Sequence, residues 1–363
     1  MCKSHTTKIW FYQWQYFDGS SWSNVINNTP SGSVYTGGTS TSLNCSSISA
    51  AGSYQYRCQI TSPGLGCDAI FTNTVTVDVL ADPTVTVQPI AGPSICLGGT
   101  QVLSLTATGG TPSLTYNWQS NNSGTWVNVA NGTPTGAVYT GATTNSLTIA
   151  GISVVGSTQY RCQVLATGNG CGTATSTTST LNVVAAPSIS TQPVITQTLC
   201  VGGTPTNLQA IASGGTPSLQ YQWYSNSANS YTGATLVSGA TSATYTPSTA
   251  AAGTVYYFCT VTAAGNGCNP INSSISEVIV VPDPAISAQP LLSQTVCTGG
   301  TLTSLSVTAS GGTPSLTYQW YSSSTNAYAG SPIVGANSAS YTPPTASAGT
   351  TYNYSIVSAA GNG

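Results

Sequence analysis

Three copies of one ten-residue motif constrain this chain more than any other feature. The motif Gly-Gly-Thr-Pro-Ser-Leu-x-Tyr-x-Trp occurs at residues 109–118, 214–223 and 311–320. Its glycines and proline favour a turn, and the tyrosine and tryptophan then alternate as in a β-strand, with the tryptophan requiring a large apolar pocket. A chain that repeats this pattern is a tandem array of similar units.

Other residues recur with the same spacing, about 97 to 105 positions. They are Trp14, Trp118, Trp223 and Trp320; Cys58, Cys162 and Cys259; and Cys67, Cys171 and Cys268. The period predicts four domains: an N-terminally incomplete repeat one (1–81), repeat two (82–185), repeat three (186–282) and a C-terminally incomplete repeat four (283–363). The joints between them are short and contain proline, which favours a semi-rigid string.

Apolar and polar residues alternate within the repeats, which is the pattern of half-buried strands. In repeat two the alternating apolar positions are Leu103 and Leu105, Leu147 and Ile149, and Tyr160, Cys162 and Val164. No stretch has sustained helical spacing, and β-branched residues are abundant. The sequence therefore predicts short antiparallel strands, about seven in each sandwich-like unit.

Charged residues are scarce: the chain of 363 residues has four basic and six acidic side chains. Charged residues make up about a quarter of a typical soluble domain. We expect Ser, Thr, Asn and Gly to cover the surface, and we expect no nucleic-acid partner because there is no basic patch. No apolar run is long enough to cross a bilayer, so we expect no membrane insertion by this segment.

No group of residues predicts catalysis, a cofactor or a metal ion. The acidic residues are scattered, and Asp82 and Asp283 stand beside prolines at joints, where we interpret them as turn residues. The single histidine, His5, lies in an atypical opening segment, so no Ser-His pair is expected in the repeats. We expect no enzymatic activity, and no catalytic, cofactor-binding or metal-binding residues.

Aromatic side chains divide into core and surface candidates. Trp118, Trp223 and Trp320 are expected in the core. Three tyrosines near glycine-rich turns are the best candidates for exposed rings that could stack on sugars, although packing at strand edges is the favoured interpretation. They are Tyr139, Tyr231 and Tyr328.

Two groups of motifs resemble known families. Tyr160-Arg-Cys162, with Trp118 earlier in the repeat, resembles immunoglobulin-like domains, which carry a tyrosine two residues before the cysteine of strand six. The Cys-x-Gly-Gly-Thr, Gly-Gly-Thr-Pro-Ser-Leu and Gly-Asn-Gly-Cys segments resemble tandem bacterial Ig-like repeats of long secreted adhesins and gliding-motility proteins of the Bacteroidetes type. The fold class that this implies is all-β, a tandem array of immunoglobulin-like β-sandwich domains.

The resemblance implies an extracellular, cell-surface location and a non-enzymatic stalk or adhesin segment made of rigid repeats, as in a filament. The alternative is a spacer or carbohydrate-binding array of a secreted glycoside hydrolase. The expected partners are a surface polysaccharide or protein, and further copies through unpaired strand edges of repeat four.

Eleven cysteines with regular spacing and no C-x-x-C pair indicate an oxidising compartment and structural disulfides. The candidates are Cys96, Cys171, Cys200, Cys268 and Cys297. In an immunoglobulin-like topology Cys96 and Cys171 would lie about 20 Å apart, at opposite ends of one sandwich, whereas a disulfide needs Cα atoms within about 7 Å. The favoured pairing is therefore Cys96 with Cys268 across a joint, and Cys96 with Cys171 stays the alternative.

Overall fold

The computed structural model describes residues 9–63, 68–121, 123–168 and 170–361. His5 and Cys67 lie outside these residues. Every helix or strand assigned within them is a β-strand, so the fold is all-β as the sequence predicts. The chain forms two compact units, one of residues 1–93 and 98–183 and the other of residues 94–97 and 184–363.

The first unit contains the strands of repeat one and most strands of repeat two. Those of repeat one are β1 (Phe11–Phe17), β2 (Trp22–Asn24), β3 (Val34–Thr36), β4 (Asn44–Ser46), β5 (Gly52–Thr61), β6 (Ile70–Phe71) and β7 (Val75–Val79). Those of repeat two are β8 (Thr84–Val87), β10 (Thr100–Ser104), β11 (Thr106–Thr108), β12 (Leu114–Asn121), β13 (Val127–Asn128), β14 (Val138–Thr140), β15 (Ser146–Ala150), β16 (Gly156–Ala166), β17 (Thr173–Thr175) and β18 (Ser179–Val184).

The second unit contains β9 and the strands of repeats three and four. Those up to the end of repeat three are β9 (Ser94–Cys96), β19 (Ser188–Thr191), β20 (Thr196–Cys200), β21 (Leu208–Gln209), β22 (Ile211–Ser213), β23 (Leu219–Asn226), β24 (Thr235–Leu236), β25 (Thr244–Tyr245), β26 (Gly253–Ala263), β27 (Ile271–Asn272) and β28 (Ser276–Val281). Those of repeat four are β29 (Ala285–Ala288), β30 (Leu305–Ser306), β31 (Thr308–Ser310), β32 (Leu316–Ser323), β33 (Ser331–Pro332), β34 (Ser340–Tyr341) and β35 (Tyr352–Ala359).

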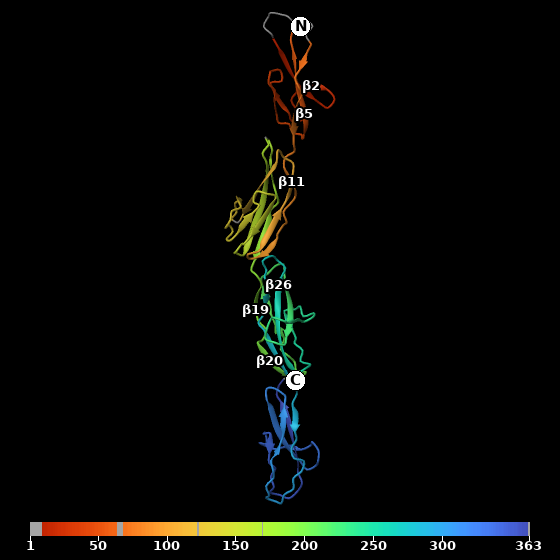
Figure 1. The fold of residues 1–363 in the computed structure, drawn as a ribbon, viewed down its shortest axis with the longest axis vertical. Helices are drawn as coiled ribbons and strands as arrows, with labels where there is room; N and C mark the ends of the chain where they lie inside the picture. Colours follow the sequence, from red (N-terminus) through yellow and green to blue (C-terminus); the bar gives the residue numbers. More distant parts are fainter. Residues whose placement is uncertain (1–8, 64–67, 122, 169, 362–363) are drawn as a thin grey trace. The chain divides into compact units, whose positions relative to one another are not determined.

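Repeat three illustrates the sandwich topology, and Figure 1 labels its strands β19, β20 and β26. One sheet has the order β20-β28-β26-β23-β24, and β27 also pairs with β26. The strands of the facing layer pair as β21 with β25 and β19 with β22. Strand β20 runs parallel to β28, whereas β26 is antiparallel to its neighbours. This is an immunoglobulin-like sandwich, and the chain is a tandem array of such repeats.

Repeats two and three have more strands than the roughly seven expected in each sandwich, in part because the first edge strand is divided. Pro193 stands between β19 and β20. Proline has no N–H to donate to a strand ladder, so it interrupts the strand. The segment before it, β19, pairs with β22, whereas the segment after it, β20, pairs with β28 in the other sheet.

One tryptophan fills the core of each of repeats two to four. Trp118, Trp223 and Trp320 are completely buried. In repeat three the indole Nε1 donates to the carbonyl oxygen of Ser242 at 2.9 Å, and the corresponding bonds in repeats two and four have the same length. A buried indole N–H needs such an acceptor, so the ring fixes the loop before β25 as well as filling space.

The Gly-Gly turn packs against the joint that precedes each of these repeats. Gly214 has φ +80°, and a Cβ there would lie 2.5 Å from the carbonyl oxygen of Ala186. Gly215 N donates to Ala185 O at 2.8 Å, and the equivalent residues at the two other joints make the same bond. A side chain at Gly214 would collide with the joint, and one at Gly215 would crowd Ala263, Leu219 and Pro187. The hydrogen bond of the turn in return holds the joint.

The cross-strand neighbour of the core tryptophan is a cysteine in repeats two and three and a serine in repeat four. The paired residues are Trp118 and Cys162, Trp223 and Cys259, and Trp320 and Ser355. Burial raises the pKa of the Cys162 and Cys259 thiols to about 11, so both are protonated near neutral pH and behave as small apolar groups. The Ser355 hydroxyl is buried without a hydrogen-bond partner among the described residues.

Replacing Ser355 by cysteine should therefore stabilise repeat four. An unsatisfied buried hydroxyl costs about 1–3 kcal/mol, which the less polar thiol avoids. We expect Ser355→Cys to slow amide hydrogen exchange in β32 and β35 by roughly fivefold or more. The reciprocal control, Cys259→Ser, should accelerate exchange in β23 and β26. Unchanged exchange in both variants would show that the hydroxyl is not costly.

Candidate functional site

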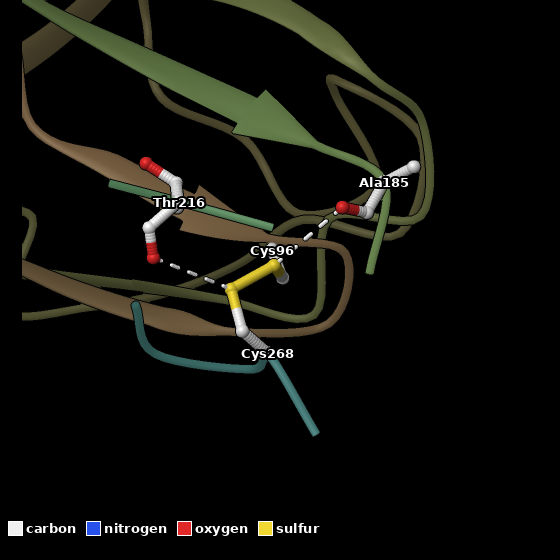
Figure 2. Close-up of a disulfide and its surroundings, with 4 residues drawn as sticks. All are labelled: Cys96, Ala185, Thr216 and Cys268. Carbon is white, nitrogen blue, oxygen red and sulfur yellow. Dashed lines mark hydrogen bonds between the residues drawn. A yellow bond between two sulfur atoms is a disulfide. The ribbon is translucent and has the colours of Figure 1, made fainter. Parts of the chain in front are cut away.

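The structure joins Cys96 to Cys268 by a disulfide (Figure 2). The Cα atoms lie 5.0 Å apart although the residues are 172 positions apart in sequence. Cys96 ends β9, and Cys268 lies in the loop between β26 and β27. The bond therefore links the first strands of repeat two to a loop of repeat three. Of the two pairings considered, it is the one across the joint, and Cys171 keeps a free thiol.

Backbone groups from three segments enclose this disulfide. Cys96 N donates to Asn266 O at 2.9 Å, which ties β9 to the loop before Cys268. As Figure 2 shows, the sulfur of Cys96 lies 3.6 Å from the carbonyl oxygen of Ala185, and that of Cys268 lies 3.9 Å from that of Thr216. Ala185 belongs to the joint and Thr216 to the Gly-Gly turn. The bond is thus buried where the joint, the turn and the loop meet.

The remaining candidate cysteines are unbonded in the structure. Cys200 is buried at the end of β20, Cys171 is half-buried in its loop, and Cys297 is exposed. A further free thiol, that of Cys45, is not among these candidates. Its sulfur lies 3.8 Å from the hydroxyl of Tyr56.

Three of the carboxylates accept local hydrogen bonds. Asp82 accepts a bond of 2.8 Å from Gly172 N, which fits the interpretation of Asp82 as a joint residue. Backbone N–H groups of the Ser20 and Ser21 turn bond to Asp18 and hold its pKa well below the usual range. Glu277 accepts a bond of 2.8 Å from the hydroxyl of Tyr256.

Asp18, Asp82 and Glu277 belong to different parts of the chain: repeat one, the joint before repeat two, and repeat three. Within the described residues, no three His, Cys, Asp or Glu side chains come together in a way that could hold a metal ion. In the same part of the chain, no helix has the length and apolar character needed to cross a lipid bilayer.

The outer face of the sheet in repeats one and two carries an arginine covered by aromatic rings. The Arg161 guanidinium lies 4.3 Å from the Trp126 ring centroid, and its Nε donates to Gln119 at 2.9 Å. Arg57 lies between two rings, 4.3 Å from Trp22 and 4.0 Å from Phe71. Cation–π contacts of this kind hold the charge in place on the sheet.

The same face carries aromatic clusters in repeats three and four. In repeat three, Tyr224 stacks on Phe258 at 5.2 Å and Tyr231 meets Phe258 edge-on at 4.9 Å. In repeat four, Tyr321, Tyr354 and Tyr328 form the matching cluster, with centroid distances of 5.1 Å for both pairs. Tyr328 is 89% exposed and Tyr231 is 46% exposed. The sequence indicated two of these rings, and strand alternation could have added Tyr224, which follows the buried Trp223.

Tyr139 is buried, so of the two interpretations of this candidate the favoured one, packing within the strands, applies and an exposed ring does not. Its hydroxyl lies 3.0 Å from that of Tyr160 and donates to Thr133 O at 2.8 Å. Burial raises the pKa of both phenols. The ring lies on the inner face of β14, where it satisfies the hydroxyl of the strand-six tyrosine.

Comparisons with known proteins support a repeat architecture without naming an activity. A family model described as a domain of unknown function (DUF8696) matches twice, at residues 191–282 and 289–362. The two matches fall in repeats three and four, less than half of the chain. No curated protein matches the sequence.

Several solved structures are similar to this chain. The I-band fragment I67–I69 from titin is 16% identical with a TM-score of 0.43, and the match covers 66% of this chain and 79% of that chain. Extracellular domains 3–5 of Drosophila OTK are 19% identical with a TM-score of 0.35, covering 75% and 86%. The N-terminal four Ig domains of Dscam1 isoform 7.44 are 15% identical with a TM-score of 0.26, covering 97% and 91%. Likeness at these levels says nothing about function.

Removing the disulfide should destabilise repeats two and three. It closes a loop of 172 residues, and the loop-closure entropy of so long a loop corresponds to about 5 kcal/mol. We expect Cys268→Ser to lower the free energy of unfolding of these repeats by up to about that amount, measured by urea denaturation without reductant. The matched control is Cys171→Ser, which removes a free thiol at the same loop position. Equal effects of the two replacements would contradict this role.

Proposed function

We propose that the chain is a non-enzymatic segment of an extracellular stalk or adhesin, in which the Ig-like repeats hold a binding region away from a cell surface. The observation that carries this proposal is the Cys96–Cys268 disulfide, which ties consecutive repeats together at their joint. A bond that links two repeats restricts the joint between them. It adds nothing to a catalytic centre, whereas it directly serves a semi-rigid spacer.

Two further observations support this proposal. The Gly-Gly turns hydrogen-bond to the joints before repeats two, three and four, which also limits bending. A structural disulfide forms and persists in oxidising surroundings, which supports an extracellular location. The same proposal includes the resemblance to secreted adhesin repeats of the Bacteroidetes type. It also includes a surface polysaccharide or protein as the partner.

Replacing the repeats in the producing cell tests the spacer function. Residues 82–282 are exchanged for two unrelated Ig domains of similar length, or for a Gly/Ser linker with the same number of residues. A flexible coil spans only about 5–6 Å times the square root of its residue number, so the linker should reduce cell adhesion and the unrelated Ig pair should preserve it. Lost adhesion with the Ig pair, despite normal surface display, would show that the repeats themselves bind.

Carbohydrate binding is the second candidate function, and the cluster of Tyr321, Tyr328 and Tyr354 favours it. The exposed ring of Tyr328 makes a T-shaped contact with Tyr354, which in turn stacks on Tyr321. It offers the apolar surface that sugar rings pack against. Side chains around it are uncharged, which suits a neutral sugar better than an ionic ligand.

A glycan array with the intact chain separates the two functions. The spacer proposal expects these repeats to retain no glycan, because in that proposal a surface polysaccharide or protein is bound by the separate binding region that the repeats carry. Retention by the wild type that Tyr328→Ala abolishes would instead support carbohydrate binding through this cluster. Tyr352→Ala is the matched control, since Tyr352 is 39% exposed on β35 and makes no ring contact in the cluster.

A further inference from the structure

Repeat three carries a free thiol and one half of the disulfide on the same short stretch of chain. Cys259 lies in the middle of β26, and Cys268 lies nine positions later in the loop that follows this strand. Cys268 is bonded to Cys96, whereas the thiol of Cys259 is free. A nucleophile and a disulfide that are neighbours in sequence are therefore both present in this repeat.

The folded repeat keeps these two sulfurs apart. The Cys259 side chain is completely buried beside Trp223, its partner across the strand pair. Cys268 lies beyond the end of β26, because its sulfur is 3.9 Å from the carbonyl oxygen of Thr216, which precedes the strand that pairs with β26. The extended chain from Cys259 to Ala263, the last residue of β26, is about 13 Å long. A disulfide needs Cα atoms within about 7 Å, so a Cys259–Cys268 bond is incompatible with the folded repeat.

Unfolding of repeat three removes this separation. Burial raises the pKa of the Cys259 thiol to about 11, and an exposed cysteine returns to about 8.5. More of the thiol is then thiolate, which is the form that attacks a disulfide.

Loop-closure entropy favours a new bond between Cys259 and Cys268 in the unfolded repeat. This bond closes a loop of nine residues, whereas the native bond closes one of 172. The difference favours the small loop on the order of 50- to 100-fold. Cys200, the other free thiol of repeat three, is 68 positions from Cys268 and competes less well.

We propose that Cys259 is a latent thiol that opens the link between repeats two and three when repeat three unfolds. Its thiolate attacks the sulfur of Cys268, so that the Cys259–Cys268 bond forms and the Cys96–Cys268 bond breaks. The electron pair of the broken bond goes to the Cys96 sulfur, which takes up a proton from water in place of the one that Cys259 lost. One disulfide replaces another, and no oxidant or reductant is consumed.

The exchange converts a link between repeats into a small loop that prevents repeat three from refolding. Unfolding of this repeat would thus be recorded covalently, and the joint before it would be released. The inference rests on the disulfide and the position of Cys259 and not on the stalk proposal, so either can fail without the other.

The test uses the full chain with its native disulfide. The chain is held at pH 8 without reductant, in urea that abolishes the hydrogen-exchange protection of β23 and β26. It is then acidified, treated with N-ethylmaleimide and digested with chymotrypsin. This protease cleaves after aromatic residues, and none lies between Cys259 and Cys268, so both cysteines stay on one peptide.

Urea should change the state of this peptide. Without urea we expect Cys259 to carry maleimide and the peptide to be cross-linked to that of Cys96. After unfolding, the peptide should contain an internal disulfide and no maleimide, and Cys96 should carry maleimide. On dilution from urea, β23 and β26 should regain protection only after the disulfide is reduced.

Two variants identify the attacking thiol. In Cys259→Ser, at a urea concentration that unfolds repeat three to the same extent, the Cys96–Cys268 pair should disappear roughly tenfold more slowly or not at all. Cys200→Ser is the matched control, which removes the other free thiol of the repeat and should exchange like the wild type. Persistence of the Cys96–Cys268 pair in the unfolded wild type, or equal rates of loss in Cys259→Ser and the wild type, overturns the proposal.

Discussion

Burial of one tryptophan between two sheets is the interaction on which each complete repeat depends. Trp223 is held on three sides: by its own strand, by Cys259 across the strand pair, and by the Ser242 carbonyl that accepts its N–H. Truncating such a buried ring typically costs about 3–5 kcal/mol. A sandwich with so few charged groups has few other interactions that stabilise it by a comparable amount. The strands and the loop before β25 are therefore arranged around this ring.

The sequence predicted those features that depend on periodicity within a strand. Alternation identified the buried Trp118, Leu147 and Val164, and the period identified the repeats. The outer-face clusters were only partly predictable, because the contact between Tyr224 and Phe258 depends on which residues face each other across two strands. The contact of Tyr139 with Tyr160 was unpredictable for the same reason: Tyr160 lies on another strand, and the glycine-rich turn beside Tyr139 kept an exposed ring open as an alternative.

Position in the fold separates the mid-strand core cysteines from the bonded cysteines at the joint. Cys162 and Cys259 lie mid-strand in the core, where burial keeps the thiols protonated and therefore poor nucleophiles. Cys96 and Cys268 lie at a strand end and in a loop, where joint and turn bring their sulfurs together. The separation limits incorrect pairing in the folded chain, since the core thiols are enclosed and protonated. It also explains why serine can replace the core cysteine in repeat four without affecting a disulfide.

The Cys96–Cys268 bond closes a covalent ring that contains nearly all of repeats two and three. When the chain is stretched and the strands that flank this ring are extended, the tension passes from one sulfur to the other. The backbone between residues 97 and 267 then carries none of that tension. Pulling on the ends of the oxidised chain can therefore unravel only the segments outside the ring. Single-molecule stretching would register the ring as missing contour length that reappears on reduction, so the redox state sets how far the chain can extend under force.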